Sequence, residues 1–181
     1  MLEKNLFAGF GGQGMLLIGH LLAHAGMTEG KHVTWLPSYG PEMRGGTANC
    51  SVVISDRPIA SPVITKASCV VAMNRPSLDK FEDTVREGGI LIINSSLIDI
   101  KSKRDDITVV YVPANEIAER IGSRQVANMV VLGAYLELAK CVELESLLEA
   151  LLETLGARKA HLVDINKLAL AEGAKCVGQS Q

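Results

Sequence analysis

Short apolar runs and longer amphipathic segments alternate along the chain. Six runs are rich in β-branched and other apolar residues, have the length of strands, and are bounded by glycine, proline, asparagine or serine. They cover residues 4–10, 31–37, 47–55, 68–74, 90–96 and 107–113. The run at 47–55 follows the previous run without a helix-length connection, so we expect this strand to be antiparallel or to lie at an edge of the sheet.

Helical periodicity fills the segments between and after these runs. One helix is expected over 12–30 and another over 75–89, with a proline at its start and two glycines at its end. Beyond residue 113 only helices are expected, over 115–122, 125–142, 144–155 and 164–176. This order predicts a Rossmann-like α/β fold: a three-layer α/β/α sandwich around a mixed, mainly parallel sheet, with a helical C-terminal part. We expect residues 1–181 to form a single domain.

Composition narrows the class of protein. The net charge of −2 gives no reason to expect binding to nucleic acid or to anionic membranes. No apolar run is long enough to span a bilayer, and no signal-peptide pattern is present, so we expect a cytoplasmic protein. Apolar residues make up 48% of the chain, and the helix at 125–142 is apolar nearly all round. We therefore expect a large buried contact between this helix region and another chain.

Neither the cysteines nor the histidines form a recognisable metal motif. No cysteine pair has CxxC spacing, so we expect reduced thiols buried as small apolar residues. His20 and His24 lie one helical turn apart, but Leu21 follows His20 where a zinc-hydrolase helix carries glutamate, and no third ligand is evident. We therefore predict that this chain has no metal site. The four cysteines are Cys50, Cys69, Cys141 and Cys176.

A glycine-rich turn, "GFGGQG", joins the first strand to the first helix. Its spacing matches the dinucleotide-binding fingerprint, but the second strand ends in "WLPS" without the carboxylate that would hold a ribose. The NAD interpretation fails on this point. Two alternatives stay open: the turn binds a phosphate or another anion through free N–H groups, or it only permits tight packing. The candidate cofactor-binding residues are Gly11, Gly12, Gln13 and Gly14.

The segment "LPSYGPEMRGGTANC", residues 36–50, combines stiff prolines, permissive glycines, an aromatic ring and two opposite charges. This composition is typical of a loop that lines a substrate site or a subunit interface. The candidate residues are Ser38, Tyr39, Glu42, Arg44, Gly45, Gly46 and Thr47.

Asparagine and serine residues at two strand ends form a second set of candidates. Asn74 and the pair Asn94 and Ser95 follow buried runs, at the sheet edge where α/β proteins bind ligands. The same residue types also cap helices at such positions. Asn128, within an apolar helix, is expected to find a hydrogen-bond partner if it is buried.

Together, "AGFGGQG", "TWLPSYGPEMRGGTANCSVVIS", "AMNRPSLDKF" and "GGILIINSSL" closely resemble the gamma subunit of 2-oxoacid:ferredoxin oxidoreductases. The resemblance covers residues 3 to about 140, and the "YGPEMRGG" block is its most specific part. Within that family the chain looks like the 2-oxoglutarate branch first and the branched-chain 2-oxoacid branch next.

The resemblance implies an enzyme that oxidatively decarboxylates a 2-oxoacid to an acyl-coenzyme A and passes the electrons to ferredoxin. It implies that thiamine diphosphate, Mg²⁺ and iron–sulfur clusters are held by alpha, beta or delta subunits, so that this chain alone is inactive. Arg44 would then clamp a substrate carboxylate or a coenzyme A phosphate, or it would pair with Glu42 and hold the loop. The alternatives are a stand-alone nucleotide-binding or regulatory module and a purely structural interface subunit. Isolated, the chain could form a homodimer.

Overall fold

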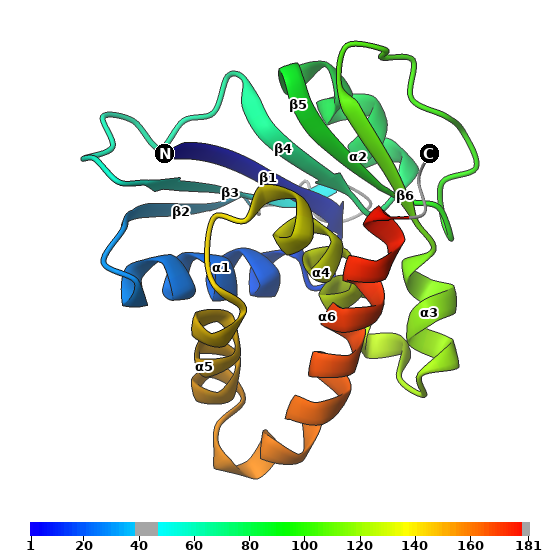
Figure 1. The fold of residues 1–181 in the computed structure, drawn as a ribbon. Coiled ribbons are helices and arrows are strands. Elements are labelled where there is room, and N and C mark those ends of the chain that lie inside the picture. Colours follow the sequence, from blue (N-terminus) through cyan, green and yellow to red (C-terminus); the bar gives the residue numbers. More distant parts are fainter. Residues whose placement is uncertain (39–46, 179–181) are drawn as a thin grey trace.

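The computed structural model describes residues 1–38 and 47–178, and its centre is one mixed sheet of six strands in the order β2-β3-β1-β4-β5-β6 (Figure 1). Strands β1, β4, β5 and β6 run parallel, whereas β3 is antiparallel to both neighbours, β1 and β2. The antiparallel expectation for residues 47–55 is confirmed, but β3 lies inside the sheet and β2 forms the edge. The strands are β1 (Leu2–Phe10), β2 (His32–Ser38), β3 (Thr47–Ser55), β4 (Ala67–Ala72), β5 (Val85–Asn94) and β6 (Thr108–Val112).

Helices cover the two faces of the sheet unequally. Helices α1 and α4 lie against one face, with α3, α5 and α6 on the same side, whereas α2 covers the other face (Figure 1). The α/β/α sandwich and the helical C-terminal part are thus confirmed. The helices are α1 (Met15–Thr28), α2 (Arg75–Phe81), α3 (Ala114–Arg120), α4 (Ala127–Ala139), α5 (Leu144–Leu155) and α6 (Val163–Val177), with 3₁₀ turns η2 (Glu82–Thr84), η3 (Arg124–Val126) and η4 (Ala157–Leu162).

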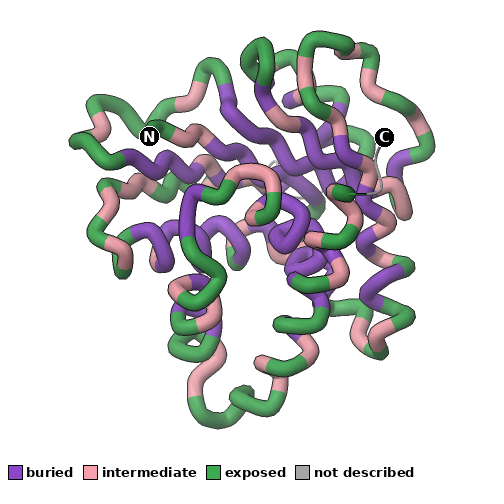
Figure 2. The backbone as a smooth tube through the Cα atoms, in the orientation of Figure 1, coloured by how far each residue is buried: buried purple, intermediate pink, exposed green. Residues whose placement is uncertain are grey.

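The larger core lies between the sheet and the helices on the side of α1 and α4. Alternate side chains of the strands point into it, and Phe7 of β1 meets Tyr135 of α4 edge to face, with ring centroids 5.5 Å apart. A smaller core lies under α2 and includes Leu78 and Phe81. Buried residues are concentrated in the sheet and in α4, while α5 and the start of α6 alternate between buried and more exposed residues (Figure 2).

Helix α4 is buried by its own chain. Every residue from 127 to 135 is buried, and α6 crosses this helix closely enough that Gly133 faces the Leu170 carbonyl and Gly173 faces the Val130 carbonyl. The all-round apolar pattern therefore reflects burial between the sheet and α6. The prediction that this helix forms the contact with another chain was wrong for residues 127–135.

The helix expected over 75–89 is shorter than its pattern indicated. Helix α2 ends at Phe81, a 3₁₀ turn follows, and β5 begins at Val85. Strand β5 pairs with β4, and the register shifts between the pairs Ala67–Val85 and Cys69–Ile90. The glycines at 88 and 89 lie between Val85 and Ile90, at this shift. Gly88 has a φ of 68° and donates its N–H to the Asp106 carbonyl at 2.9 Å. The two glycines thus mark an irregularity inside a strand instead of a helix stop.

Candidate functional site

The parallel part of the sheet has a switch point between β1 and β4. Helix α1 follows β1 on one face and α2 follows β4 on the other, so the chain leaves the carboxyl ends of these neighbouring strands in opposite directions (Figure 1). In open α/β sheets, ligands bind in the crevice outside such a point. The glycine turn and Asn74 both lie there, so the structure brings these two sequence candidates together.

The glycine turn is closed by its own glutamine. The Phe10 N–H donates to Gln13 Oε1 at 2.6 Å, and the Gln13 N–H donates to the Phe10 carbonyl at 3.1 Å. Gly12 and Gly14 have φ values of 89° and 77°, a region that other residues adopt only at a cost. Gly11 is exposed in the same turn. Two of the glycines are therefore required by the backbone itself, whether or not a ligand binds.

Gly14 has a further constraint, because α4 packs against it. A Cβ atom at Gly14 would lie 2.4 Å from Asn128 Nδ2, whereas a Cβ at Gly12 would meet no atom of the described residues within 4 Å. Asn128 is 5% exposed and donates to the Gly14 carbonyl at 3.4 Å. Its Oδ1 accepts the Met129 N–H at 3.0 Å, which confirms the expectation that this buried amide has partners. The packing role is therefore real at Gly14, while Gly12 borders open space.

Asn74 joins the glycine turn to α2. Its Oδ1 accepts the Ser77 N–H at 2.9 Å and caps the helix, while its Nδ2 donates to Gln13 Oε1 at 3.2 Å. The same Gln13 oxygen thus receives hydrogen bonds from both β1 and Asn74. This network holds the two sides of the switch point together.

A crevice of about 190 Å³ opens between the glycine turn, η3 and the start of α4. Among the described residues that line it, the one cation is Arg124, whose side chain is 80% exposed and forms an ion pair with Glu119. The first backbone N–H groups of any α-helix have no partner within the helix, and the N-cap residue of α1, Gly14, has no side chain to cap them. Arg124 favours an anionic group in the crevice, and the start of α1 follows two of its lining residues, Gly12 and Gln13, along the chain. The lining residues are Gly12, Gln13, Met73, Asn115, Arg124, Gln125, Ala127 and Asn128.

Asn115, Arg124 and Gln125 were not among the sequence candidates. They lie in α3 and η3, more than a hundred positions beyond the glycine turn. No spacing rule links such distant segments, so local pattern could not have found them.

Asn94 is fully buried and holds the ends of three elements together. Its Nδ2 donates to the Met73 carbonyl at 3.3 Å and to Asn115 Oδ1 at 2.8 Å, while its Oδ1 accepts the Ala114 N–H at 3.2 Å. Ser95 lines a separate hollow next to Tyr111. Of these two candidates, Asn94 supports the crevice from behind through Asn115, and Ser95 lies apart from it.

The ends of the proline- and glycine-rich loop are placed by strand pairing. Thr47 pairs with Phe10, directly before the glycine turn, and Ser38 pairs with Asn49 two positions further along β3. Both ends of the loop therefore lie at the sheet edge that carries the crevice. Five of the candidates, Tyr39, Glu42, Arg44, Gly45 and Gly46, lie outside the described residues.

The sheet order gives a second reason against the NAD interpretation. A dinucleotide fold places its second strand beside its first, so that an acidic residue at the end of the second strand reaches the ribose. Here β3 lies between β1 and β2. The end of β2 is therefore one strand further from the glycine turn, as well as lacking a carboxylate.

The two histidines of α1 each contact a side chain of another element, His20 one of β2 and His24 one of α5. His20 stacks edge to face on Trp35, with ring centroids 5.4 Å apart, and His24 Nε2 lies 3.2 Å from a Glu153 carboxylate oxygen. Within residues 1–38 and 47–178, no group of three or more histidine, cysteine, aspartate or glutamate side chains could hold a metal ion. In the same part of the chain, no helix is both long and apolar enough to cross a bilayer.

The family model described as pyruvate ferredoxin/flavodoxin oxidoreductase matches residues 4–176. The chain belongs to this family. It is 43% identical over 168 residues to the ketoisovalerate oxidoreductase subunit VorA of Methanothermobacter marburgensis, covering 92% of this chain and 35% of the relative. It is 36% identical over 172 residues to the 2-oxoglutarate synthase subunit KorC of Methanocaldococcus jannaschii, covering 92% of each.

The fold is that of a solved gamma subunit of the family. The keto/oxoacid ferredoxin oxidoreductase gamma subunit from Geobacter sulfurreducens superimposes with a TM-score of 0.87 at 28% identity, over 99% of this chain and 98% of that one. The family predicted from the sequence is therefore confirmed. The chain spans about a third of the length of the VorA relative, 35%, but nearly the whole of KorC, 92%.

Proposed function

We propose that residues 1–181 act as one domain, the gamma subunit of a multisubunit 2-oxoacid:ferredoxin oxidoreductase. The assembled cytoplasmic enzyme would convert a 2-oxoacid and coenzyme A to an acyl-coenzyme A, carbon dioxide and reduced ferredoxin. The observation that carries this proposal is the match to KorC and to the Geobacter gamma subunit over nearly the full length of both partners. Neither a stand-alone nucleotide-binding module nor a purely structural subunit is favoured by a relative of this kind.

For the substrate we propose a branched-chain 2-oxoacid or 2-oxoglutarate. The names of the two relatives give these two acids, and the identity is higher to VorA, 43% against 36%. We propose that alpha, beta and delta subunits hold thiamine diphosphate, Mg²⁺ and the iron–sulfur clusters.

For this chain's own residues we propose that the crevice at the switch point binds a phosphate of coenzyme A. Gly12 and Gln13 of the glycine turn line the crevice, the N-terminal end of α1 follows them, and Arg124 adds a positive charge. Binding there would position the thiol end of coenzyme A for the acyl group formed on a neighbouring subunit. The role of Arg44 and of the rest of its loop stays a prediction.

The test is steady-state kinetics of the complex that the chain forms when co-expressed with its alpha, beta and delta subunits. Arg124→Gln should raise the KM for coenzyme A about tenfold, the effect of about 1.4 kcal/mol, and leave the KM for the 2-oxoacid unchanged. Arg120→Gln is the matched control, because Arg120 is also exposed and also pairs with a glutamate, Glu172, but does not line the crevice. Equal KM values for coenzyme A in the two variants would exclude the crevice as the binding site of a coenzyme A phosphate. A complex that is inactive with both 2-oxoglutarate and a branched-chain 2-oxoacid would refute the proposed enzyme activity.

A further inference from the structure

Helix α5 carries more apolar surface than its own chain covers. One side, with Leu147, Ala150 and Leu151, is buried in the core shared with α1. A second row follows at four-residue spacing, and its first and last members, Leu144 and Leu152, are 45% and 50% exposed. Residues at this spacing share one helix face. Leu148, between Leu144 and Leu152, is partly buried against the core, so the exposed apolar surface of α5 lies at the two ends of this row.

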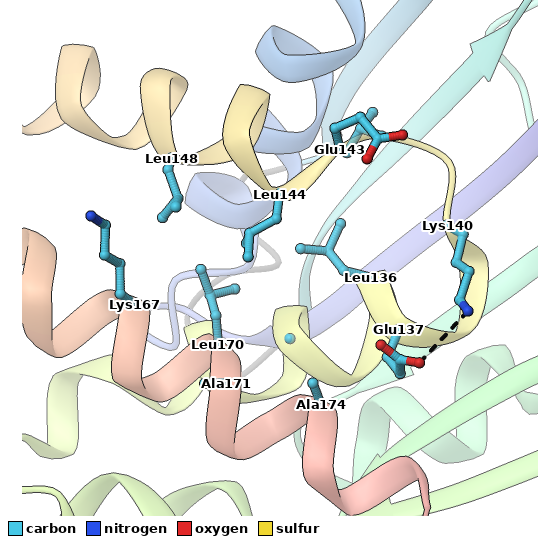
Figure 3. Close-up of a pocket in the computed structure, with 12 residues that line it drawn as sticks. Leu136, Glu137, Lys140, Glu143, Leu144, Leu148, Lys167, Leu170, Ala171 and Ala174 are labelled. Atoms are coloured by element: carbon cyan, nitrogen blue, oxygen red, sulfur yellow. Dashed lines mark ion pairs between the residues drawn. The ribbon is translucent and has the colours of Figure 1, made fainter.

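The first two members of this row, Leu144 and Leu148, line an apolar cleft. The cavity has a volume of about 330 Å³ and lies between α5, α6 and the C-terminal end of α4. Figure 3 shows Leu144 and Leu148 of α5 pointing toward Lys167 and Leu170 of α6, with Leu136 of α4 to one side of them. Both long walls of the cleft are helices, and their facing side chains are mostly apolar.

In the cavity lining, Glu137 and Lys140 form an ion pair with each other, Glu143 lies at the start of α5 and Lys167 lies on α6, while two further glutamates of α5 lie just outside the lining. Glu145 and Glu149 follow Leu144 and Leu148 by one position, about 100° around the helix, so an acidic edge runs along the leucine row. Neither glutamate forms an ion pair with any residue in the described part of the chain, and the same holds for Lys167 on the opposite wall. An occupant that complements the cleft would therefore present an apolar ridge with cations toward α5 and an acidic group toward α6.

The length of the leucine row favours a helix over a small molecule. From Leu144 to Leu152 the row extends about 12 Å, two helical turns, and Leu152 lies beyond the residues that line the cavity. A ligand confined to the cavity would leave Leu152 exposed. Two copies of this chain that met through α5 would bring their acidic edges together, which is unfavourable. An amphipathic helix laid along the row would cover it completely.

We propose that the cleft between α5 and α6 receives an amphipathic helix of another subunit of the same oxidoreductase. This inference rests on the proposed function, because it requires that partner subunits exist. The helix carries an apolar ridge that packs on Leu144, Leu148 and Leu152, and basic residues that face Glu145 and Glu149. The cleft is thus a docking surface on the side of the molecule away from the sheet (Figure 1).

The test measures the Kd of the purified chain for the complex of its remaining subunits. The double variant Leu144→Gln/Leu152→Gln should raise this Kd at least tenfold. Leu168→Gln is the matched control, since Leu168 is equally exposed at 45% but lies on α6 outside the cavity lining, and it should leave the Kd unchanged. Both isolated variants should keep the wild-type Tm, because the substituted leucines are exposed. Glu145→Lys/Glu149→Lys should also weaken binding, and less so at high salt.

The outcomes separate the two proposals. If the wild-type chain does not bind the other subunits at all, the proposed function fails and the cleft proposal fails with it. If wild-type and double variant bind equally well, only the cleft proposal is overturned. Self-association of the wild-type chain that is lost in the double variant, with unchanged binding to the other subunits, would assign the cleft to a second copy and would likewise overturn it.

Discussion

The crossing of α4 and α6 gives the sharpest stability prediction. At this point the helices touch backbone to backbone: a Cβ atom added at Gly133 would lie 2.0 Å from the Leu170 carbonyl oxygen, and one at Gly173 would lie 1.8 Å from the Val130 carbonyl oxygen. Ordinary contact begins at 3.4 Å, so Gly133→Ala requires the helices to separate by about 1.4 Å. The obstacle is backbone, so rotation of a side chain cannot relieve it.

The cost can be estimated from two opposing effects. Overpacking a well-packed core typically destabilises by about 1–3 kcal/mol and occasionally by more, and separation of α4 from α6 places this site at or above the upper end. Replacement of glycine by alanine inside a helix returns about 1 kcal/mol. We therefore expect Gly133→Ala to lower the free energy of unfolding by about 2 kcal/mol or more. For a chain of this size that corresponds to a fall in Tm of about 4–8 °C.

Urea and thermal unfolding of the purified chain, followed by circular dichroism, measure this effect. Gly178→Ala is the control, because Gly178 ends the same helix α6 with a φ of −77° and no atom within 4 Å of an added Cβ. That variant should unfold like the wild type. The double variant Gly133→Ala/Gly173→Ala should lose less stability than the sum of the losses in the two single variants, since one separation of the helices relieves both contacts. A Gly133→Ala protein as stable as the wild type would refute the close crossing.

Two further predictions concern side chains. Burial opposes ionisation of Glu29, but hydrogen bonds from Lys31 Nζ at 2.6 Å and the Glu143 N–H at 2.7 Å outweigh it and lower the pKa of Glu29 below its ordinary value. A group whose pKa is lowered in the folded state stabilises the fold at pH values above its unfolded-state pKa. This stabilisation is lost as the pH falls through the folded-state pKa. Glu29→Gln should therefore cost about 1.5–3 kcal/mol in urea melts at pH 7, and this cost should shrink as the pH falls through the folded-state pKa; a cost that does not change with pH would contradict this. Burial raises the pKa of Cys50 to about 12 and also protects Cys69 and Cys141, so iodoacetamide should modify half-buried Cys176 first. Mass spectrometry that finds two or more modified cysteines at equal rates in the native chain would contradict the burial.

Local pattern in the sequence determined most of the secondary structure and the place of the glycine turn. A strand, a glycine-rich turn and a helix are neighbours along the chain, so spacing alone identified residues 11–14 as a candidate site. The "YGPEMRGG" block and its flanking strands identified the family, which the matched model over residues 4–176 confirms. These features depend on contacts between residues a few positions apart, and those contacts leave a readable period.

Tertiary structure decided the rest, and α4 shows why. Its apolar pattern is the same whether the helix is covered by its own chain or by another, because hydrophobic burial is not directional. Only the crossing with α6 shows that residues 127–135 are covered internally. Likewise the glycines at 88 and 89 look like a helix stop until the register of β5 is known.

Tertiary structure also decided which residues line the crevice. Asn128 reaches the Gly14 carbonyl across 114 positions of sequence, and Arg124 enters from a 3₁₀ turn that no nearby motif marks. The sequence by itself determined that a glycine turn begins α1; the packing of α3, η3 and α4 against the carboxyl ends of β1 and β4 decided which side chains surround it. Contacts between distant segments follow from how whole elements pack, and that packing leaves no periodic trace in the chain.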